Sequence, residues 1–278
     1  MAGQWIGPYL VLAQAGRGGV GTVYRCSAED GKEVAVKLLS AGADAAQRAR
    51  FRLEVEALSR LRHPDVIRCL GAGEQDGAPY LVTEWADGET LQRRLERGGP
   101  LSQPAAAALV ARLARAIEAV HQAGILHRDL NPQNVLLRGE DHPVVTDFGL
   151  AKDVLPSASP SASVRGRGMG TPAYWPPEQA RGRLEEIGPR SDVYGLGGLL
   201  FAALTGQPPH RGDTLLEQLS APDRLPELDP RLRARVQALD PALWSICMRA
   251  LAPRPADRHP SAAALAEELA RWLAARPS

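Results

Sequence analysis

Four short stretches of the chain contain residues whose types and spacing could bind a phosphate ester and act on it. The first, Gly16 to Val23, reads GRGGVGTV and fits the pattern G-x-G-x-x-G-x-V, with its glycines at Gly16, Gly18 and Gly21. Glycines let backbone N–H groups approach phosphate oxygens without obstruction, but an ordinary tight turn explains such a triplet equally well. A strand-like segment follows, Thr22 to Cys26, where a dinucleotide-binding fold would begin a helix. The stretch therefore predicts a glycine loop within a β-hairpin.

Lys37 ends the second stretch, Val34 to Lys37, on the strand that follows the glycine loop. Only three of the 33 basic residues are lysines, at positions 32, 37 and 152. Arginine does not reproduce the compact ammonium group that some phosphate sites require, so each lysine is informative. The pattern indicates that the Lys37 ammonium faces whatever the glycine loop covers, and a phosphate is its natural partner.

A carboxylate is needed to hold such a lysine, and the helix expected between Ala43 and Leu61 offers Glu54 and Glu56. At about 100° per residue, Glu54 lies about 40° from Leu58 and about 60° from Phe51 on the apolar face. Glu56 lies about 140° from Phe51. We expect Glu54 to face inward and Glu56 to be a solvated surface charge.

The third and fourth stretches are His127 to Asn134, reading HRDLNPQN, and Asp147-Phe148-Gly149. At these residues the chain resembles the protein kinases, and specifically the bacterial members of the Ser/Thr kinase group. The resemblance covers Tyr9 to about Trp272, with every motif in the order that the family requires.

The resemblance implies Mg-ATP as cofactor and Ser/Thr hydroxyls of protein substrates as acceptors. It implies that Asp129 accepts or orients the hydroxyl proton, that Asn134 and Asp147 hold magnesium, and that Lys37, paired with Glu54, binds the α- and β-phosphates. The adenine would be held by side chains above and below it, by hinge backbone, and by a small residue behind. These residues are Val23 and Ala35 above, Leu136 below, the backbone of Glu84 and Ala86, and Thr83 behind.

The resemblance implies structural or regulatory roles for several further residues. His127 and Phe148 are expected to be core packing, stacked with Leu58 and Cys69 and anchored by Asp192. Glu178, in the segment Gly170 to Glu178 with Pro176 where the family usually has alanine, should pair with Arg258 inside the larger lobe. Arg128 before the catalytic aspartate indicates that a phosphorylated activation segment docks on it. The candidate acceptors are Ser157, Ser159, Ser161, Ser163 and Thr171, and a plain Ser/Pro-rich loop is the alternative.

Asn131 departs from the family, which carries lysine there in contact with the γ-phosphate. By analogy with loss of one preorganised donor, we expect a rate roughly a hundred- to a thousandfold lower, nearer the lower end because asparagine keeps an N–H donor. The alternative is an ATP-binding pseudokinase that acts as a scaffold. A small-molecule phosphotransferase is disfavoured because it would not need the substrate platform that the segment Thr171 to Glu178 resembles.

The resemblance predicts an α+β fold of two lobes, with residues 1–278 forming one kinase domain. The small, mainly β lobe with one key helix would span 9–84, the hinge 85–89 and the larger, mainly α lobe 90–275. Ser102 is expected to cap a helix that stops at Gly124, and further helices are expected around 192–204, 239–250 and 261–275.

The composition of the chain indicates which binding partners and which cellular compartment to expect. A formal net charge of +1 and the absence of a basic run argue against nucleic acid. Three widely spaced cysteines suit reduced thiols in a cytosolic protein better than disulfides. The abundance of arginine, alanine, glycine and proline resembles a GC-rich bacterial genome, and no segment predicts a signal peptide or membrane span. We expect a cytoplasmic enzyme, or the cytoplasmic domain of a larger membrane kinase, that could dimerise for trans-autophosphorylation.

Overall fold

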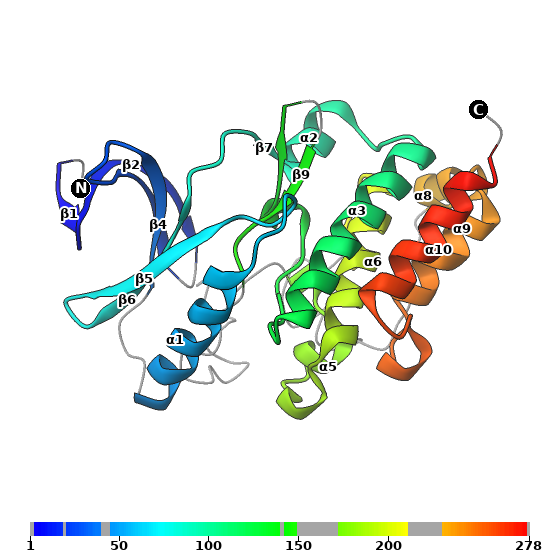
Figure 1. Cartoon of the computed structure of the whole chain (residues 1–278). Coiled ribbons are helices and arrows are strands. Elements are labelled where there is room, and N and C mark those ends of the chain that lie inside the picture. Colours follow the sequence, from blue (N-terminus) through cyan, green and yellow to red (C-terminus); the bar gives the residue numbers. More distant parts are fainter. Residues whose placement is uncertain are drawn as a thin grey trace.

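The fold has a β-rich lobe and a helical lobe joined by one short connection (Figure 1). The structure is a computed structural model, and it describes residues 3–18, 21–39, 45–139, 142–148, 172–210 and 230–276. Residues 85–88 lie outside helices and strands and connect β6, the strand that ends the first lobe, to β7; Glu89, included in the expected hinge 85–89, begins β7. None of the helices in these ranges combines the length and apolar character needed to cross a membrane.

The first lobe is a six-stranded antiparallel sheet with strand order β1-β2-β3-β4-β6-β5. The turn between β3 and β4 is at Asp30-Gly31, with Gly31 at φ +78°, where a side chain would be strained. The predicted helix is confirmed, and Phe51, Val55 and Leu58 are buried on its inner face. The elements are β1 Trp5–Ile6, β2 Tyr9–Gly18, β3 Gly21–Ser27, β4 Glu33–Leu39, α1 Ala45–Arg60, β5 Cys69–Gln75 and β6 Ala78–Glu84.

The second lobe is built around helix α6, Pro189–Thr205, which is buried along its length from Ser191 to Thr205. Helices α3, α9 and α10 pack around it, as Figure 1 shows. Ser102 accepts a hydrogen bond from the Ala105 N–H and caps α3, as predicted. The other helices are α2 Leu91–Gly98, α3 Gln103–Gln122, α5 Pro177–Ala180, α8 Pro230–Gln237, α9 Pro241–Ala250 and α10 Ala262–Ala274.

A small antiparallel sheet lies where the two lobes meet. It consists of β7 Glu89–Thr90, β8 Val135–Arg138 and β9 His142–Val145, in that order. Val145 also hydrogen-bonds through its backbone to Asp65 and Ile67, which lie between α1 and β5. The segments that surround the third and fourth motifs are therefore tied to both lobes.

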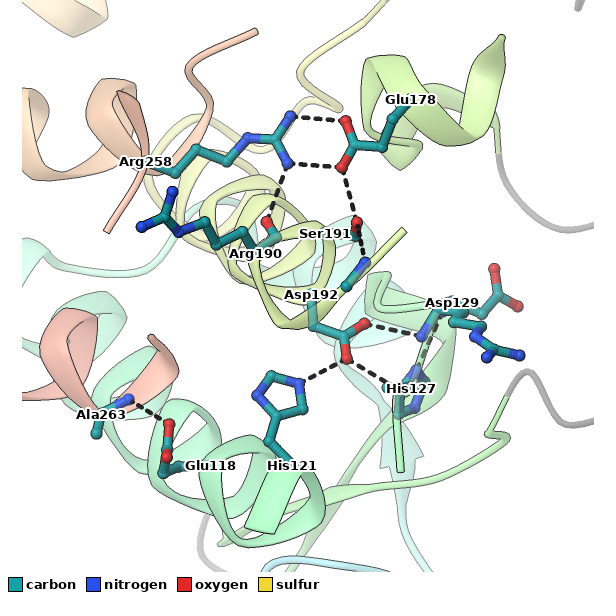
Figure 2. A network of polar contacts seen from close by, with 12 residues as sticks. Glu118, His121, His127, Asp129, Glu178, Arg190, Ser191, Asp192, Arg258 and Ala263 are labelled. Atoms are coloured by element: carbon teal, nitrogen blue, oxygen red, sulfur yellow. Dashed lines mark hydrogen bonds and ion pairs between the residues drawn. The ribbon is translucent and has the colours of Figure 1, made fainter. Parts of the chain in front are cut away.

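Glu178 and Arg258 form the ion pair that the resemblance implies, inside the helical lobe (Figure 2). The guanidinium donates to both carboxylate oxygens at 2.8 and 2.9 Å, and both side chains are at most 1% exposed. The other Arg258 N–H groups bind the carbonyls of Arg190, Ala252 and Pro253, so all its donors are used. Burial alone would raise the pKa of Glu178, but the hydrogen bonds and charge of Arg258 outweigh burial and lower it.

Replacing Glu178 by glutamine should therefore destabilise the fold by about 3–5 kcal/mol near neutral pH, because it leaves the Arg258 charge buried without its counter-ion. The effect has a defined pH dependence. Since the pKa of Glu178 is below its ordinary value of 4.5 in the fold, its ionisation stabilises the protein above pH 4.5, and this contribution is lost as the pH falls through the lowered value. Urea unfolding should show a difference in the free energy of unfolding between wild type and Glu178→Gln, and this gap should narrow on acidification.

Glu56→Gln is the matched control, because Glu56 is 57% exposed and pairs with Arg60 on the surface of α1. It should cost less than about 1 kcal/mol. A Glu178→Gln gap as small as that of the control, or one that does not change with pH, would contradict the structural role given to the pair.

Candidate active site

The glycine stretch forms the end of the β2–β3 hairpin. Gly16 lies opposite Val23 and Gly18 opposite Gly21, while residues 19 and 20 lie outside the described ranges. A Cβ at Gly21 would come within 2.2 Å of the Leu38 carbonyl oxygen, so no other residue fits there without displacing the backbone of β4. Strand β3 thus approaches β4 closely at this end because position 21 is glycine.

Strands β3 and β4 bring the predicted roof residues to one face of the sheet. Val23, Ala35 and Lys37 are all half-buried on this face, whereas the residues that alternate with them are buried on the other. Val23 lies opposite Lys37, and Ala35 lies opposite Thr83 on β6. Four of the predicted nucleotide contacts are therefore neighbours across three strands.

The predicted hinge residue Glu84 ends β6 of the large sheet, and the predicted floor residue Leu136 lies on β8, the central strand of the small sheet. The Glu84 carboxylate accepts hydrogen bonds from the Arg138 guanidinium at 3.0 Å and the Arg68 N–H at 3.2 Å. These bonds fix the end of β6 to β8, the strand that carries Leu136, whose side chain is half-buried. The side chain of Glu84 thus ties the two lobes together, and Ala86 follows it in the connection.

The loop His127 to Asn134 is anchored by the buried carboxylate of Asp192 on α6 (Figure 2). This carboxylate accepts the backbone N–H groups of His127 and Arg128 and the ring Nε2 of His121, each at 2.8 Å. Burial would raise the pKa of Asp192, but the hydrogen bond from the His121 ring, electrostatic interactions with both histidines and the hydrogen bond from the His127 backbone lower it overall. Arg128 is thereby held at φ +62°, a conformation that non-glycine residues rarely adopt.

His127 connects this loop to the segment that contains Asp147. Its Nδ1 accepts the Asp129 N–H at 3.2 Å and its Nε2 bonds the Thr146 carbonyl at 2.9 Å, an arrangement that assigns the proton to Nε2. Its ring contacts Phe148, with centroids 4.8 Å apart. Both ring nitrogens are engaged with backbone groups, which supports the packing role expected of His127 over an acid–base role.

Asp129 and Asn134 point toward each other. The Asn134 amide donates to the Asp129 carbonyl at 2.8 Å and to its carboxylate Oδ2 at 3.1 Å. Asn134 is buried, and this bonding leaves its Oδ1 directed away from Asp129. The two predicted functional groups are therefore held in a single hydrogen-bonded arrangement.

The side chain of Asn131 is hydrogen-bonded to the backbone of its own loop. Its Oδ1 accepts the Gln133 N–H at 2.9 Å, and its Nδ2 donates to the Asp129 carbonyl at 3.0 Å. The side chain is buried and caps the 3₁₀ turn Pro132–Asn134. We expected its N–H to remain a donor for phosphate. One N–H of the amide is used within its own loop, which leaves the second N–H as the donor on which this prediction depends.

The charges of the site are paired differently from the prediction. Lys37 forms an ion pair with Asp147 at 3.2 Å, and the inward-facing Glu54 forms one with Arg128 at 3.7 Å. The expected Lys37–Glu54 pair is thus not formed. The periodicity of α1 correctly predicts which way Glu54 faces, but the packing of the helix brings its carboxylate to the guanidinium of Arg128 instead.

Some of the predicted site residues lie outside the part of the chain that the structure describes. They are Gly149 and the candidate phosphorylation sites Ser157, Ser159, Ser161, Ser163 and Thr171.

Sequence reasoning missed His121, the side-chain donor to Asp192. Its place in the last turn of α3, just before Gly124 and the catalytic-looking loop, was the available indication.

Comparisons with known proteins agree with this geometry. The family model described as "Protein kinase domain" matches residues 9–269. The chain is 39% identical to "Serine/threonine-protein kinase PkaA" of Streptomyces coelicolor over 95% of its length, and 35% identical to "Serine/threonine-protein kinase PknD" of Mycobacterium tuberculosis over 95%. It spans 49% and 39% of the length of those relatives.

A solved structure shows the same fold. The chain aligns with the "Crystal structure of Rad53 1-466 in complex with AMP-PNP" at a TM-score of 0.74 and 25% identity, over 96% of this chain and 65% of that one. The two-lobed architecture predicted from the sequence is confirmed by this match and by the elements described above. The chain belongs to the protein kinase family, with bacterial Ser/Thr protein kinases among its relatives.

Proposed function

We propose that this chain transfers the γ-phosphoryl group of ATP to serine or threonine hydroxyls of proteins. The observation that carries the proposal is the convergence of four polar residues from separate parts of the sequence: Lys37 and Asp147 in one ion pair, Asp129 and Asn134 in one hydrogen-bonded pair. The names of the relatives, which describe Ser/Thr protein kinases, support the choice of acceptor.

ATP would bind between the lobes with its adenine against the hinge. Val23, Ala35 and Thr83 share one side of the sheet, and Leu136 lies on β8 across the connection. The complex of Rad53 with AMP-PNP, which has the same fold, supports a nucleotide as ligand. Lys37, at the far end of this face, would then take the α- and β-phosphates.

Magnesium would be held by Asn134 and Asp147. The donor set fits a hard cation, because Asn134 keeps Oδ1 free of the Asp129 contact and the Asp147 carboxylate is 44% exposed. When bound, Mg²⁺ would neutralise the charge on the phosphate oxygens. Asp129, held by Asn134 through one carboxylate oxygen, would orient the acceptor hydroxyl and take its proton with the other.

The observed ion pairs would have to exchange before catalysis. Asp147 would release Lys37 to the phosphates, and Glu54 would leave Arg128 to hold Lys37. A phosphate on the activation segment, at one of Ser157, Ser159, Ser161, Ser163 or Thr171, would favour this exchange by attracting Arg128. Autophosphorylation between two copies would supply that phosphate, and a cytoplasmic location, free or as part of a membrane kinase, fits the use of ATP.

Phosphoryl transfer is tested with purified protein, labelled Mg-ATP and a generic protein acceptor such as casein. We expect label on serine or threonine, and Asp129→Asn should reduce the transfer by roughly 10²- to 10⁴-fold because the proton acceptor is lost. Thermal unfolding and binding of ATP by Asp129→Asn show that the variant is folded. Transfer by the wild type that equals this blank would exclude the proposed activity and leave a nucleotide-binding scaffold.

The Asn131→Lys variant tests separately how position 131 affects the rate and how it affects stability. The introduced ammonium should raise kcat roughly a hundredfold, since one preorganised donor to the transferring phosphate is restored. It should also lower Tm by several degrees, because the cap and the bond to the Asp129 carbonyl are lost.

Asn131→Ala is the matched control, since it loses the same two hydrogen bonds without gaining a charge. We expect it to lower both Tm and kcat. An unchanged kcat in a folded Asn131→Lys protein would show that the missing lysine does not limit the rate.

A further inference from the structure

The exposed side of strands β3 and β4 presents its side chains in a fixed order. Lys37 and Val23 are cross-strand partners at one end, Ala35 and Arg25 are partners next along, and Glu33 follows Arg25 diagonally at the other end. All five are half-buried on this face. With a rise of about 3.3 Å per residue, Arg25 lies roughly 7 Å beyond Val23, away from the phosphate-binding lysine.

Arg25 is held at this end by two partners. Its guanidinium makes hydrogen bonds of 2.6–2.9 Å with both oxygens of Glu33. Its Cζ also lies 5.3 Å from the ring centroid of Trp85, over the indole face. This distance is within the range of a cation–π interaction, and the carboxylate fixes where the cation can point.

Trp85 is the residue of the connection that lies between the two predicted adenine-binding backbone positions, Glu84 and Ala86. Its indole is restrained on its face by Arg25 and at its edge by Asp87, because Nε1–H donates to Asp87 Oδ1 at 2.9 Å. A side chain held in this way restricts the backbone dihedral angles of its own residue, and hence the directions of the peptide groups on either side.

We infer that Arg25 is a positioning residue for the nucleotide. It holds Trp85 against the end of the sheet and thereby fixes the backbone of Glu84 and Ala86 in the geometry that the base requires. The inference rests on the proposed binding of ATP between the lobes. It predicts an effect on nucleotide affinity alone, because Arg25 is at the opposite end of the strands from the phosphate.

The test is a double-mutant cycle with Arg25→Gln and Trp85→Leu. Arg25→Gln should raise the KM for ATP and the Kd for AMP-PNP about two- to fivefold, the size of one partly exposed cation–π contact, with kcat unchanged. Arg25→Lys, which keeps a cation, should recover most of the affinity. In the Trp85→Leu background, Arg25→Gln should have no further effect, because the residue through which it acts is gone.

Two controls keep the result interpretable. Arg254→Gln removes an exposed arginine of the other lobe, 83% exposed and paired with Asp257, and should leave the KM for ATP unchanged. Trp85→Phe keeps an aromatic face if Trp85→Leu fails to fold, and Arg25→Gln should still weaken nucleotide binding in that background.

Two results would overturn the inference. An equal loss of affinity with and without the Trp85 ring would mean that Arg25 contacts the nucleotide directly, and no loss in Arg25→Gln would mean that it has no part in binding. Both leave the proposed function standing. A wild-type protein that binds no AMP-PNP would instead overturn the proposed function and this inference with it.

Discussion

The buried carboxylate of Asp192 is the constraint on which the arrangement of the site depends. Two of its three hydrogen bonds are accepted from the backbone N–H groups of His127 and Arg128 and hold them in a conformation that would otherwise be unfavourable, with Arg128 at positive φ; the third is accepted from the His121 ring. Because Asp192 lies on the fully buried helix α6, this anchor cannot move without disturbing the core of the lobe. Gly195, one turn further along α6, has no Cβ to meet Leu130, which would lie 2.7 Å away. The loop proposed for catalysis thus packs directly against a buried helix.

Hydrogen bonds to backbone groups connect this anchor to the residues of the site. His127 joins the loop to Thr146, and its contact with Phe148 fixes the residue next to Asp147. Asn131 and Asn134 both donate to the Asp129 carbonyl from the other side of the loop. A buried backbone group that loses its partner is costly, so each of these bonds is strongly favoured. Asp129 and Asn134 are therefore held in place before any ligand binds, whereas Lys37 and Asp147 have partners that would have to exchange.

Sequence reasoning found the elements and most positions of the site, and its errors have a common cause. The helical period places Glu54 on the inner face of α1, because the angle between residues on a helix depends only on their separation. Its partner depends on how α1 packs against the loop that carries Arg128, and no local pattern contains that distance. Asn131 illustrates the same limit at shorter range, since its amide could reach either a phosphate or its own loop. The Glu178–Arg258 pair was found through family resemblance, because spacing alone does not relate residues eighty positions apart.

Burial decides which ion pairs in this protein are permanent and which can be exchanged. Glu178 and Arg258 are at most 1% exposed, so separating them would leave an uncompensated charge in the core. Lys37 is 20% exposed and Asp147 44%, and Glu54 and Arg128 are each more than a fifth exposed. Water reaches all four groups, so separating either of these pairs costs less than separating the buried pair. This lower cost makes an exchange of partners feasible when phosphates enter the site, whereas the buried pair keeps the surrounding lobe unchanged. The same chemical interaction thus serves as a fixed support in the helical lobe and as an exchangeable contact between the lobes.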